Sequence, residues 1–348
     1  MAPLLTICTI AYNQEKFIAQ TLEGFVSQRA DFEFEAIVAD DCSTDSTAKI
    51  IAGYAEKYQG IIKPALRDKN IGMTDNFSDI LRRATGRYIA LCDGDDYWTD
   101  PLKLQKQADF LEANPEYAIC FHPVEVLTTE GKTVDDFMTR DVPETTDIYD
   151  LAKRHYIHTP SVVFRNNPGA IRDFASLKAP YGDYVLHMLN AQYGKIKKLP
   201  GSMAVYRQGV GVVTLYSPAY WHTTRYMVLH LLCGYFDDKN RTVHGFLVQT
   251  KNGIAANGMR TFFQADNGKG ALDFFNGMDN NSKKDLLKYL TTAEGSLVGI
   301  HSSRGWRFLQ TLYRLGDIFM PAGSRRRRYA EKSLQFLYRS LSHERKSR

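Results

Sequence analysis

Short apolar runs with β-branched residues alternate with helical patterns through the first hundred residues, and this alternation restricts the fold more than any other feature. The run at residues 4–11 (LLTICTIA) precedes residues 17–26, where apolar side chains recur at three- and four-residue spacing. The same order returns as a strand at 34–39 and a helix at 46–58, a strand at 61–66 and a helix at 74–84, and a strand at 88–92. Because parallel strands need crossover connections, the sequence predicts an α/β fold with a mostly parallel sheet flanked by helices.

The rest of the chain predicts further α/β structure and then a helical region. After residue 101 we expect a helix to about residue 113, a strand at 117–127, a loop at 128–150, a strand at 159–165, a helix at 182–192 and a strand at 204–214. From residue 219 onward the apolar pattern is mostly helical. The chain has 348 residues, enough for two domains, which we place at residues 1–215 and 216–348.

Composition excludes several classes of protein. Hydrophobic residues make up 44% and charged residues 24% of the chain, which excludes disordered and collagen-like proteins. We expect no signal peptide and no transmembrane segment, and the five cysteines lack the CxxC spacing of a zinc site. These features predict a reduced, cytoplasmic protein.

Two acidic turns each follow a predicted strand. Residues 40–45 read Asp-Asp-Cys-Ser-Thr-Asp, and residues 93–96 read Asp-Gly-Asp-Asp. The carboxyl ends of parallel strands meet at one edge of a sheet, which is where ligands bind in such folds. Carboxylates crowded in this way must hold a cation, pair with Arg or Lys, or shift their pKa values. The turns are therefore either a divalent-metal and diphosphate site or solvated turns that cap the following helices.

Five motifs, in this order and at these spacings, resemble the family 2 glycosyltransferases with the Rossmann-like GT-A fold. They are Ala11-Tyr12-Asn13, the acidic turn at 40–45, Asn70-Ile71-Gly72, Gly86-Arg87-Tyr88-Ile89 and the acidic turn at 93–96. The resemblance covers roughly residues 4–215. Cys42 departs from the Gly or Asn usual in the family, and Ala11 from Pro or Ser, but neither change removes a carboxylate.

The resemblance implies an inverting enzyme that uses a nucleoside diphosphate sugar, with UDP as the default nucleotide. Residues 1–100 would form the nucleotide-sugar half of the domain and residues 101–215 the acceptor half. The residues implied to bind the nucleotide are Ala11, Tyr12, Asn13, Asp41, Asn70, Asp93 and Arg207. Asp95, together with Asp93, would hold Mn²⁺ or Mg²⁺ against the diphosphate.

The resemblance also implies a catalytic base near the start of a later helix. Asp183, in Tyr181-Gly182-Asp183-Tyr184, fits by type and position and would deprotonate the acceptor hydroxyl; Asp173 is the second candidate. The alternative is that Asp183 is only a first-turn carboxylate favoured by the helix dipole. Three further residues would support the site or contact the acceptor, namely Asp96, His158 and Tyr206.

The basic charge is concentrated at the end of the chain. Residues 321–348 contain nine Lys and Arg and two Glu, whereas the whole chain has a net charge of +5. Together with an amphipathic pattern at 304–320, this predicts an anionic membrane surface as a partner and a location at the inner face of the cell membrane. The alternatives are a solvated charged face or packing within a homo-oligomer. Nucleic acid is disfavoured, since no binding motif accompanies the basic run.

These expectations combine into one functional hypothesis. The chain would be a metal-dependent glycosyltransferase that adds a sugar to a glycan or lipid-linked acceptor in the synthesis of surface polysaccharide or lipopolysaccharide. One alternative is a nucleotidyltransferase, although the N-terminus lacks a Gly-rich, Lys-bearing phosphate loop. The other is a non-catalytic, membrane-associated protein that binds nucleotide sugars.

Overall fold

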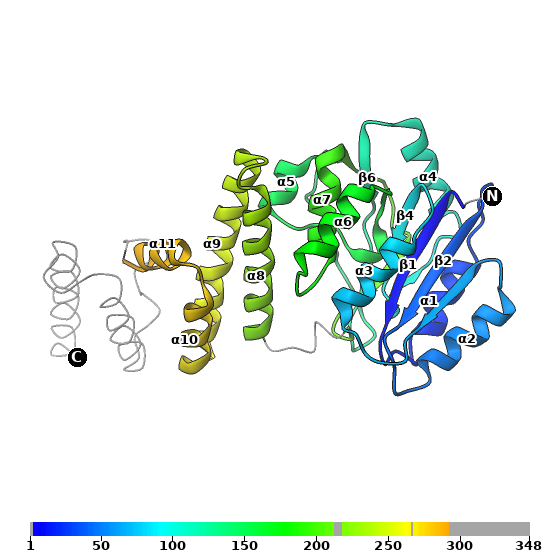
Figure 1. Cartoon of the computed structure of the whole chain (residues 1–348), viewed down its shortest axis with the longest axis horizontal. Coiled ribbons are helices and arrows are strands. Elements are labelled where there is room, and N and C mark those ends of the chain that lie inside the picture. The colour runs from blue at the N-terminus through cyan, green and yellow to red at the C-terminus, as the bar shows by residue number, and fades with distance from the viewer. Residues whose placement is uncertain (1–2, 212–217, 266, 292–348) are drawn as a thin grey trace, which may run out of the picture. The chain divides into compact units, whose positions relative to one another are not determined.

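The computed structural model describes residues 3–211, 218–265 and 267–291, and the chain divides into two compact units, residues 1–261 and residues 262–348 (Figure 1). The first unit contains the α/β part of the chain. The predicted boundary at residues 215 and 216 stays a prediction.

Within the described residues, the main sheet has eight strands in the order β3-β2-β1-β4-β10-β6-β11-β9. They are β1 (Leu5–Ala11), β2 (Phe34–Asp40), β3 (Ile62–Leu66), β4 (Tyr88–Leu91), β6 (Tyr117–Phe121), β9 (Thr145–Thr146), β10 (Val163–Arg165) and β11 (Lys195–Lys198). The neighbours β3, β2, β1 and β4 run parallel, while β10 is antiparallel to both β4 and β6. The predicted mostly parallel α/β sheet is confirmed.

Helices cover both faces of this sheet. Side chains alternate along β1, so Ile7 joins a core cluster with Leu22 and Phe25 of α1 (Ile18–Val26) while Cys8 contacts the carbonyl of Ile80 in α3 (Met73–Arg83). The first face also carries α2 (Thr47–Lys57) and α4 (Lys103–Ala113). On the second face, α3 packs against α6 (Pro168–Leu177), which packs against α7 (Asp183–Asn190).

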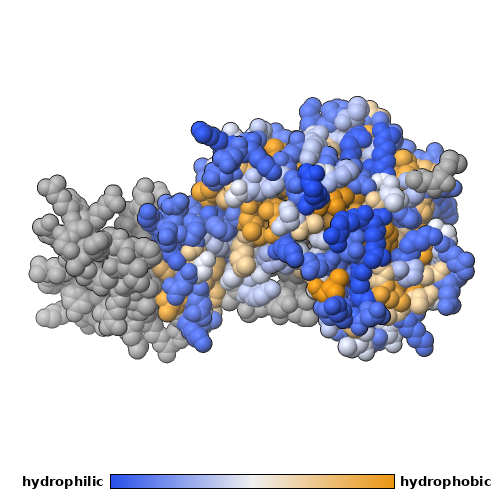
Figure 2. Space-filling model, in the orientation of Figure 1, coloured by the Kyte–Doolittle hydropathy of each residue, from blue (hydrophilic) through white to orange (hydrophobic). Residues whose placement is uncertain are grey.

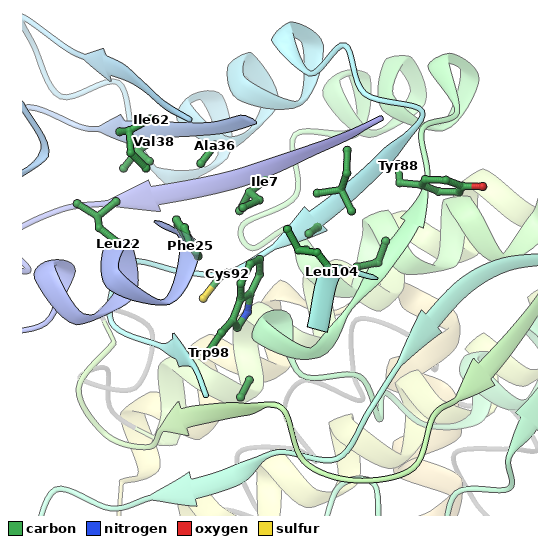
Figure 3. Packing of buried hydrophobic residues seen from close by; sticks show 14 of the residues in the cluster. Ile7, Leu22, Phe25, Ala36, Val38, Ile62, Tyr88, Cys92, Trp98 and Leu104 are labelled. Atoms are coloured by element: carbon green, nitrogen blue, oxygen red, sulfur yellow. The ribbon is translucent and has the colours of Figure 1, made fainter. Parts of the chain in front are cut away.

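Trp98 anchors the chain just after the second acidic turn. Its ring lies 4.8 Å from that of Phe25, and its indole N–H donates to the carbonyl of Pro160 at 2.9 Å. Figure 3 shows Trp98 beside Cys92, Phe25 and Leu104 in the core. The turn at residues 93–96 is therefore held between a buried strand and a buried aromatic residue.

The prediction of one strand at residues 117–127 is wrong. The chain forms β6 in the main sheet and β7 (Glu125–Leu127) in a second sheet, whose order is β5-β12-β7-β8. Pro123 lies between the two strands and lacks the N–H that a continuous strand would need. The other strands of this sheet are β5 (Tyr97–Trp98), β8 (Thr133–Val134) and β12 (Ala204–Arg207).

Several other boundaries also differ from the predictions. The expected loop at 128–150 contains β8, β9 and the start of α5 (Ile148–Lys153), and the expected strand at 159–165 begins as a 3₁₀ turn, Thr159–Ser161. The strand expected at 204–214 ends at Arg207. Helix α6 and strand β11 were not predicted.

The helical prediction from residue 219 is confirmed as far as residue 291. The helices are α8 (Pro218–Phe236), α9 (Arg241–Gln264), α10 (Gly268–Gly277) and α11 (Asn280–Thr291). Helices α8 and α9 are joined to the α/β part by the Tyr235 hydroxyl, which donates to Asp173 at 2.6 Å, and by the Thr250 hydroxyl, which donates to the carbonyl of Ala152 at 2.9 Å.

The features that suggested a membrane surface, residues 304–320 and 321–348, lie outside the described residues. Among the helices that the structure describes, none has the length and hydrophobicity needed to cross a bilayer. Figure 2 shows a face of the chain on which hydrophilic and apolar residues are mixed. All five cysteines lie in the described part, and each is a free thiol.

Candidate functional site

The carboxyl ends of β1 and β2 are tied together by the motif around Asn13. Its side-chain oxygen accepts from the backbone N–H of Thr44 at 2.8 Å, and its own N–H donates to the Ser43 hydroxyl at 2.8 Å. Ala11 is buried at the end of β1, whereas the ring of Tyr12 is 36% exposed. Tyr12 therefore offers an accessible aromatic surface at the sheet edge, where a nucleobase could stack.

Asp41 holds a neighbouring loop. Its two carboxylate oxygens accept from the backbone N–H groups of Ile71 and Gly72 at 2.8 and 2.9 Å, and the Asn70 amide donates to the Asp41 carbonyl at 3.0 Å. The structure thus gives Asp41 and Asn70 a loop-closing role that sequence reasoning missed. Each carboxylate oxygen keeps a second lone pair, so a contact with a nucleobase stays a prediction.

The departure from the family pattern at Cys42 has a conformational consequence. Cys42 has a φ of +61°, in the left-handed region that Gly and Asn adopt most readily. This backbone geometry explains why Gly or Asn is common at the position. Cys42 keeps the turn but adopts a conformation that is unfavourable for its side chain.

The turn at residues 93–96 is packed tightly against β1 and α1. The N–H of Gly94 donates to the carbonyl of Ile10 at 3.1 Å, and the Thr21 hydroxyl lies 2.9 and 2.6 Å from the carbonyl oxygens of Gly94 and Asp96. A Cβ atom at Gly94 would lie only 2.3 Å from Oε1 of Gln14. Only glycine therefore fits between the two carboxylates without rearrangement.

Arg207, at the end of β12, is fixed against this turn. Its backbone N–H donates to the buried Asp96 carboxylate at 2.8 Å, and its guanidinium donates to the Asp95 carbonyl and the Gln20 side chain. The guanidinium also lies 4.4 Å from the centre of the Tyr97 ring. Asp96 and Arg207 thus brace the turn, and the predicted contact of Arg207 with a donor phosphate remains untested.

The carboxylates of the turn are electrostatically strained. Burial, and then the charges of Asp95 and Asp183, raise the pKa of Asp93 well above its usual value. Burial also raises the pKa values of Asp95 and Asp96, and Arg207 partly offsets both shifts. Among the described residues, no side-chain or backbone donor contacts the Asp93 carboxylate.

This arrangement fits a divalent cation. Asp93 and Asp95 supply hard oxygen ligands. Their crowding favours the protonated form, and a bound cation would favour the ionised form instead. The described residues contain no ready-made cluster of three or more His, Cys, Asp or Glu ligands. Mg²⁺ and similar ions are often held by one or two carboxylates together with substrate phosphates, so two carboxylates are sufficient.

Asp183 faces the same site from the other half of the domain. It is the first residue of α7, where one carboxylate oxygen accepts from the N–H of Tyr184 at 2.7 Å and the other lies 3.5 Å from the Thr159 hydroxyl. Its charge contributes to the raised pKa values of Asp93 and Tyr206, after burial and nearer carboxylates. The fold therefore brings the predicted base towards the predicted metal ligands.

Asp173, the second candidate base, has a different environment. Its carboxylate accepts from the Tyr235 hydroxyl of α8 at 2.6 Å and lies 3.9 Å from Nζ of Lys239. Its charge does not contribute to the pKa shift of Asp93. This environment indicates that Asp173 attaches α8 to the α/β part of the chain, which favours Asp183 as the base.

His158 belongs to a buried network beside Tyr206. Its Nε2 atom lies 3.0 Å from Asp136, and its ring centre lies 5.0 Å from that of Tyr206. Although burial opposes ionisation, hydrogen bonds from His158 and Thr139 hold the pKa of Asp136 well below its usual range. Asp136 was not predicted, because its partner lies 22 residues away in a region that we expected to be a loop.

Two further histidines near Asp183 were also missed. The rings of His155 and His187 lie 5.7 Å apart, and neither ring nitrogen of the buried His187 has a hydrogen-bond partner among the described residues. Burial, and then His155, lower the pKa of His187 to about 3. His187 is therefore neutral at physiological pH, so it provides no positive charge to offset the carboxylate of Asp183.

The mostly parallel sheet with acidic turns at its edge agrees with the GT-A fold that the sequence motifs imply. The sequence model of the family Glycosyl transferase family 2 matches residues 6–178. This part of the chain is therefore a glycosyltransferase family 2 domain, in agreement with the resemblance found in the sequence.

Comparisons with individual proteins agree with this assignment. The chain is 45% identical to the uncharacterized protein Rv1520 of Mycobacterium tuberculosis over 204 residues, which are 59% of this chain and 58% of that protein. It is 32% identical over 171 residues to the putative teichuronic acid biosynthesis glycosyltransferase TuaG of Bacillus subtilis, covering 49% of this chain and 66% of that protein. The chain thus matches less than two thirds of the length of these relatives.

Solved structures support the same fold. The crystal structure of Staphylococcus aureus TarS residues 1–349 in complex with UDP-GlcNAc matches with a TM-score of 0.57 and 19% identity, covering 83% of this chain and 85% of that chain. TarS is a poly(ribitol-phosphate) beta-N-acetylglucosaminyltransferase. At this identity the likeness establishes the GT-A architecture.

Proposed function

We propose that the chain is an inverting, metal-dependent glycosyltransferase that moves a sugar from a nucleoside diphosphate sugar, with UDP as the nucleotide, to a hydroxyl group of a glycan or lipid-linked acceptor. The acceptor would belong to surface polysaccharide biosynthesis. The names of TuaG and TarS assign both proteins to the synthesis of such polymers, and TarS has been crystallised with UDP-GlcNAc. These relatives support the proposal, and the residues of the site carry it.

The strongest support for the proposal is the position of three carboxylates. Asp93 and Asp95, at the end of β4, lie close enough to Asp183 of α7 for the charge of Asp183 to raise the pKa of Asp93. The carboxylate that would help to hold the cation and the carboxylate that would act as the base are therefore within electrostatic range of each other. The proposal requires this, because the diphosphate would leave one side of the sugar while the hydroxyl attacks from the other. Solvated turns that merely cap helices would not need to face each other.

The residues of this chain would divide the reaction between them. Tyr12 would stack on the base of the donor, and Asp41 would accept a hydrogen bond from the base edge. Asp93 and Asp95 would hold Mn²⁺ or Mg²⁺, whose charge offsets the negative charge that develops on the leaving diphosphate. Asp183 would accept the proton of the acceptor hydroxyl as its oxygen attacks the anomeric carbon from the opposite face, and inversion follows.

The environment of Asp183 suits a base. Its carboxylate accepts from the N–H of Tyr184, and the neighbouring His187 is held neutral by burial. No cation among the described residues pairs with Asp183. The carboxylate therefore has no cationic partner among the described residues to give up when the acceptor hydroxyl arrives.

Donor binding tests the first half of the proposal. We would measure the thermal stability of the purified chain with UDP, GDP and dTDP and their sugars, each with Mn²⁺, Mg²⁺ or chelator. A ligand at a hundredfold excess over its Kd stabilises the native state by about 2.7 kcal/mol. We expect a metal-dependent shift with UDP that Asp95→Ala abolishes. No shift with any nucleotide would refute the donor site.

Turnover of Asp183→Asn tests the second half and separates the enzyme from a non-catalytic sugar-nucleotide binder. General base catalysis contributes about 10²–10⁴-fold, so we expect sugar transfer to fall by that factor while donor binding is unchanged. Asp173→Asn is the matched control, because Asp173 contacts Tyr235 and should affect the attachment of α8 alone. Equal loss in both variants, or no loss in Asp183→Asn, would exclude Asp183 as the base.

A further inference from the structure

The start of helix α8 carries an exposed aromatic surface that the proposed mechanism does not use. Trp221 is 37% exposed and its neighbour Tyr220 is 41% exposed. The Trp221 ring stacks on that of Tyr181, with ring centres 5.8 Å apart and planes inclined by 23°. Tyr181 precedes α7 and Trp221 belongs to α8, so packing between the two segments builds the surface. We call Tyr181, Trp221 and Arg225 the aromatic–arginine wall.

Arg225 supplies the charge of this wall. It lies one helical turn after Trp221, with its guanidinium 5.6 Å from the centre of the Trp221 ring. After burial and the charge of Asp183, which raise the pKa of Tyr181, the charge of Arg225 partly lowers it, so Arg225 is also near Tyr181. Arg225 is partly exposed, and within the described residues it forms no ion pair with a carboxylate. An arginine placed beside an aromatic ring, with no carboxylate partner among the described residues, keeps donors available for an incoming anion.

The wall lies beside the proposed catalytic base. Tyr181 is two residues before Asp183, and after burial the charge of Asp183 is the next largest cause that raises the pKa of Tyr181. The electrostatic surroundings of His155 likewise include both Asp183 and Arg225. The wall is therefore near the carboxylate that would deprotonate the acceptor hydroxyl, on the path that the rest of the acceptor would take in this proposal.

The chemistry of the wall selects the class of molecule. Exposed aromatic faces bind the apolar faces of ligand rings, and a guanidinium binds phosphate or carboxylate oxygens through paired N–H groups. A neutral glycan would use only the rings and would leave the arginine without an anionic partner. An anionic glycan would use both features.

We propose that the aromatic–arginine wall is an acceptor subsite for a glycan that bears a phosphate or carboxylate group next to the sugar unit that is glycosylated. Trp221 would stack on that sugar unit, and Arg225 would bind the anionic group. This inference rests on the proposed function, because it gives a class of acceptor to the same reaction.

Saturation-transfer NMR on the full chain, with UDP and the diamagnetic ion Mg²⁺ present, would test this subsite directly. The probes are methyl β-glucoside, methyl β-glucuronide and methyl β-glucoside 6-phosphate, which differ in the group at one position. We expect both anionic probes to bind at least about tenfold more tightly than the neutral one, as a charge-assisted hydrogen bond allows. The two anionic probes distinguish carboxylate from phosphate as the preferred group.

Variants assign the binding to the wall. Arg225→Gln should remove the preference for anionic probes, whereas Arg225→Lys should keep part of it. Trp221→Ala should weaken the binding of all three probes. Trp221→Phe retains an aromatic ring and should keep more of the binding, which separates loss of the ring from a folding defect. Met227→Ala is the matched control, since Met227 is 48% exposed on the same helix and belongs to no part of the wall.

The outcomes separate this inference from the proposed function. Binding of UDP with no preference for anionic probes, or a preference that persists in Arg225→Gln, would overturn the acceptor subsite alone. Absence of binding by every sugar probe while UDP binds would overturn it as well. Loss of UDP binding in the unmodified chain would instead refute the proposed function.

Discussion

Gly94→Ala tests whether the shape of the turn at residues 93–96 governs the site. The added Cβ would lie 2.3 Å from Oε1 of Gln14, 3.0 Å from Cδ1 of Ile18 and 3.1 Å from Cβ of Ala11. Carbon atoms in favourable contact are about 3.5–4.0 Å apart, so the turn or its neighbours must move by roughly 1 Å. Either the outer ends of the Gln14 and Ile18 side chains give way or the turn itself moves, and in the second case the flanking carboxylates of Asp93 and Asp95 move with it.

Two magnitudes follow from this displacement. Overpacking of this kind costs about 1–3 kcal/mol of unfolding free energy, which for a domain of this size lowers Tm by about 2–10 °C. A misplacement of about 1 Å at a catalytic site costs about 10²-fold in rate. We therefore expect a moderate loss of stability and a proportionally larger loss of sugar transfer.

Thermal unfolding, donor binding and sugar transfer would be measured for Gly94→Ala beside Gly53→Ala. Gly53 lies on the exposed face of α2, and no atom lies within 4 Å of the position of its added Cβ. Alanine is about 1 kcal/mol more favourable than glycine within a helix, so Gly53→Ala should be slightly more stable and fully active.

A second-site change identifies the contact responsible. Gln14→Ala combined with Gly94→Ala removes the shortest contact and should recover part of the lost stability and activity. If Gly94→Ala instead matches Gly53→Ala in both Tm and activity, the Gln14 side chain has simply rotated away. The reasoning that the turn admits only glycine would then be refuted.

Three further substitutions test separate contacts. Lys103 is fully buried, and burial lowers its pKa to about 7, so the folded state binds fewer protons than the unfolded state between pH 7 and 10.5 and its stability rises with pH across that window. Urea unfolding should therefore show that the unfolding free energy of the unmodified chain, relative to that of Lys103→Met, increases by about 3 kcal/mol from pH 7.5 to 9.5. A difference that does not change with pH would contradict a desolvation penalty on the lysine charge. Asp93→Asn should raise Tm by the equivalent of about 0.5–2 kcal/mol near neutral pH while it weakens metal-dependent donor binding, and a lower Tm would argue against electrostatic strain. Cys42→Gly should be stabilising by up to about 1 kcal/mol, because it relieves a left-handed backbone conformation, and should leave UDP binding unchanged; a clear loss of stability would show that the thiol contributes more than the backbone costs.

Apart from the two-residue strand β5, the order of strands and helices up to residue 113 could be predicted because it depends on local apolar spacing. Helix α6 was missed although its signal was present: Asn167 accepts hydrogen bonds from two N–H groups of the first turn, and Pro168 follows at the first helical position. Strand β11 carries three lysines in four residues and becomes a strand because β6 and β9 lie on either side of it. Pairing between distant segments overrides its unfavourable composition.

The candidate site shows the same division between local and distant information. The acidic turns could be found because each directly follows a strand, and strand ends converge in a parallel sheet. The contact between Arg207 and Asp96 joins residues that are 111 positions apart in the chain, and the wall formed by Tyr181 and Trp221 depends on how α8 packs. Neither arrangement has a periodic signature, so each required the structure.

The contacts also divide the acidic residues into two groups that their sequence motifs do not separate. Backbone N–H groups donate to both carboxylate oxygens of Asp41 and to one carboxylate oxygen of Asp96, and these bonds hold the loop at residues 70–72 and strand β12 in place. Asp93 has no such donor among the described residues, and the charges of Asp95 and Asp183 oppose its ionisation. Burial raises the pKa values of both Asp93 and Asp96, but only Asp96 has a backbone N–H donor that ties it to another strand. A bound cation would relieve the electrostatic strain on Asp93, and no side chain among the described residues donates to the Asp93 carboxylate, so we expect this turn to bind a ligand and not only to cap a helix.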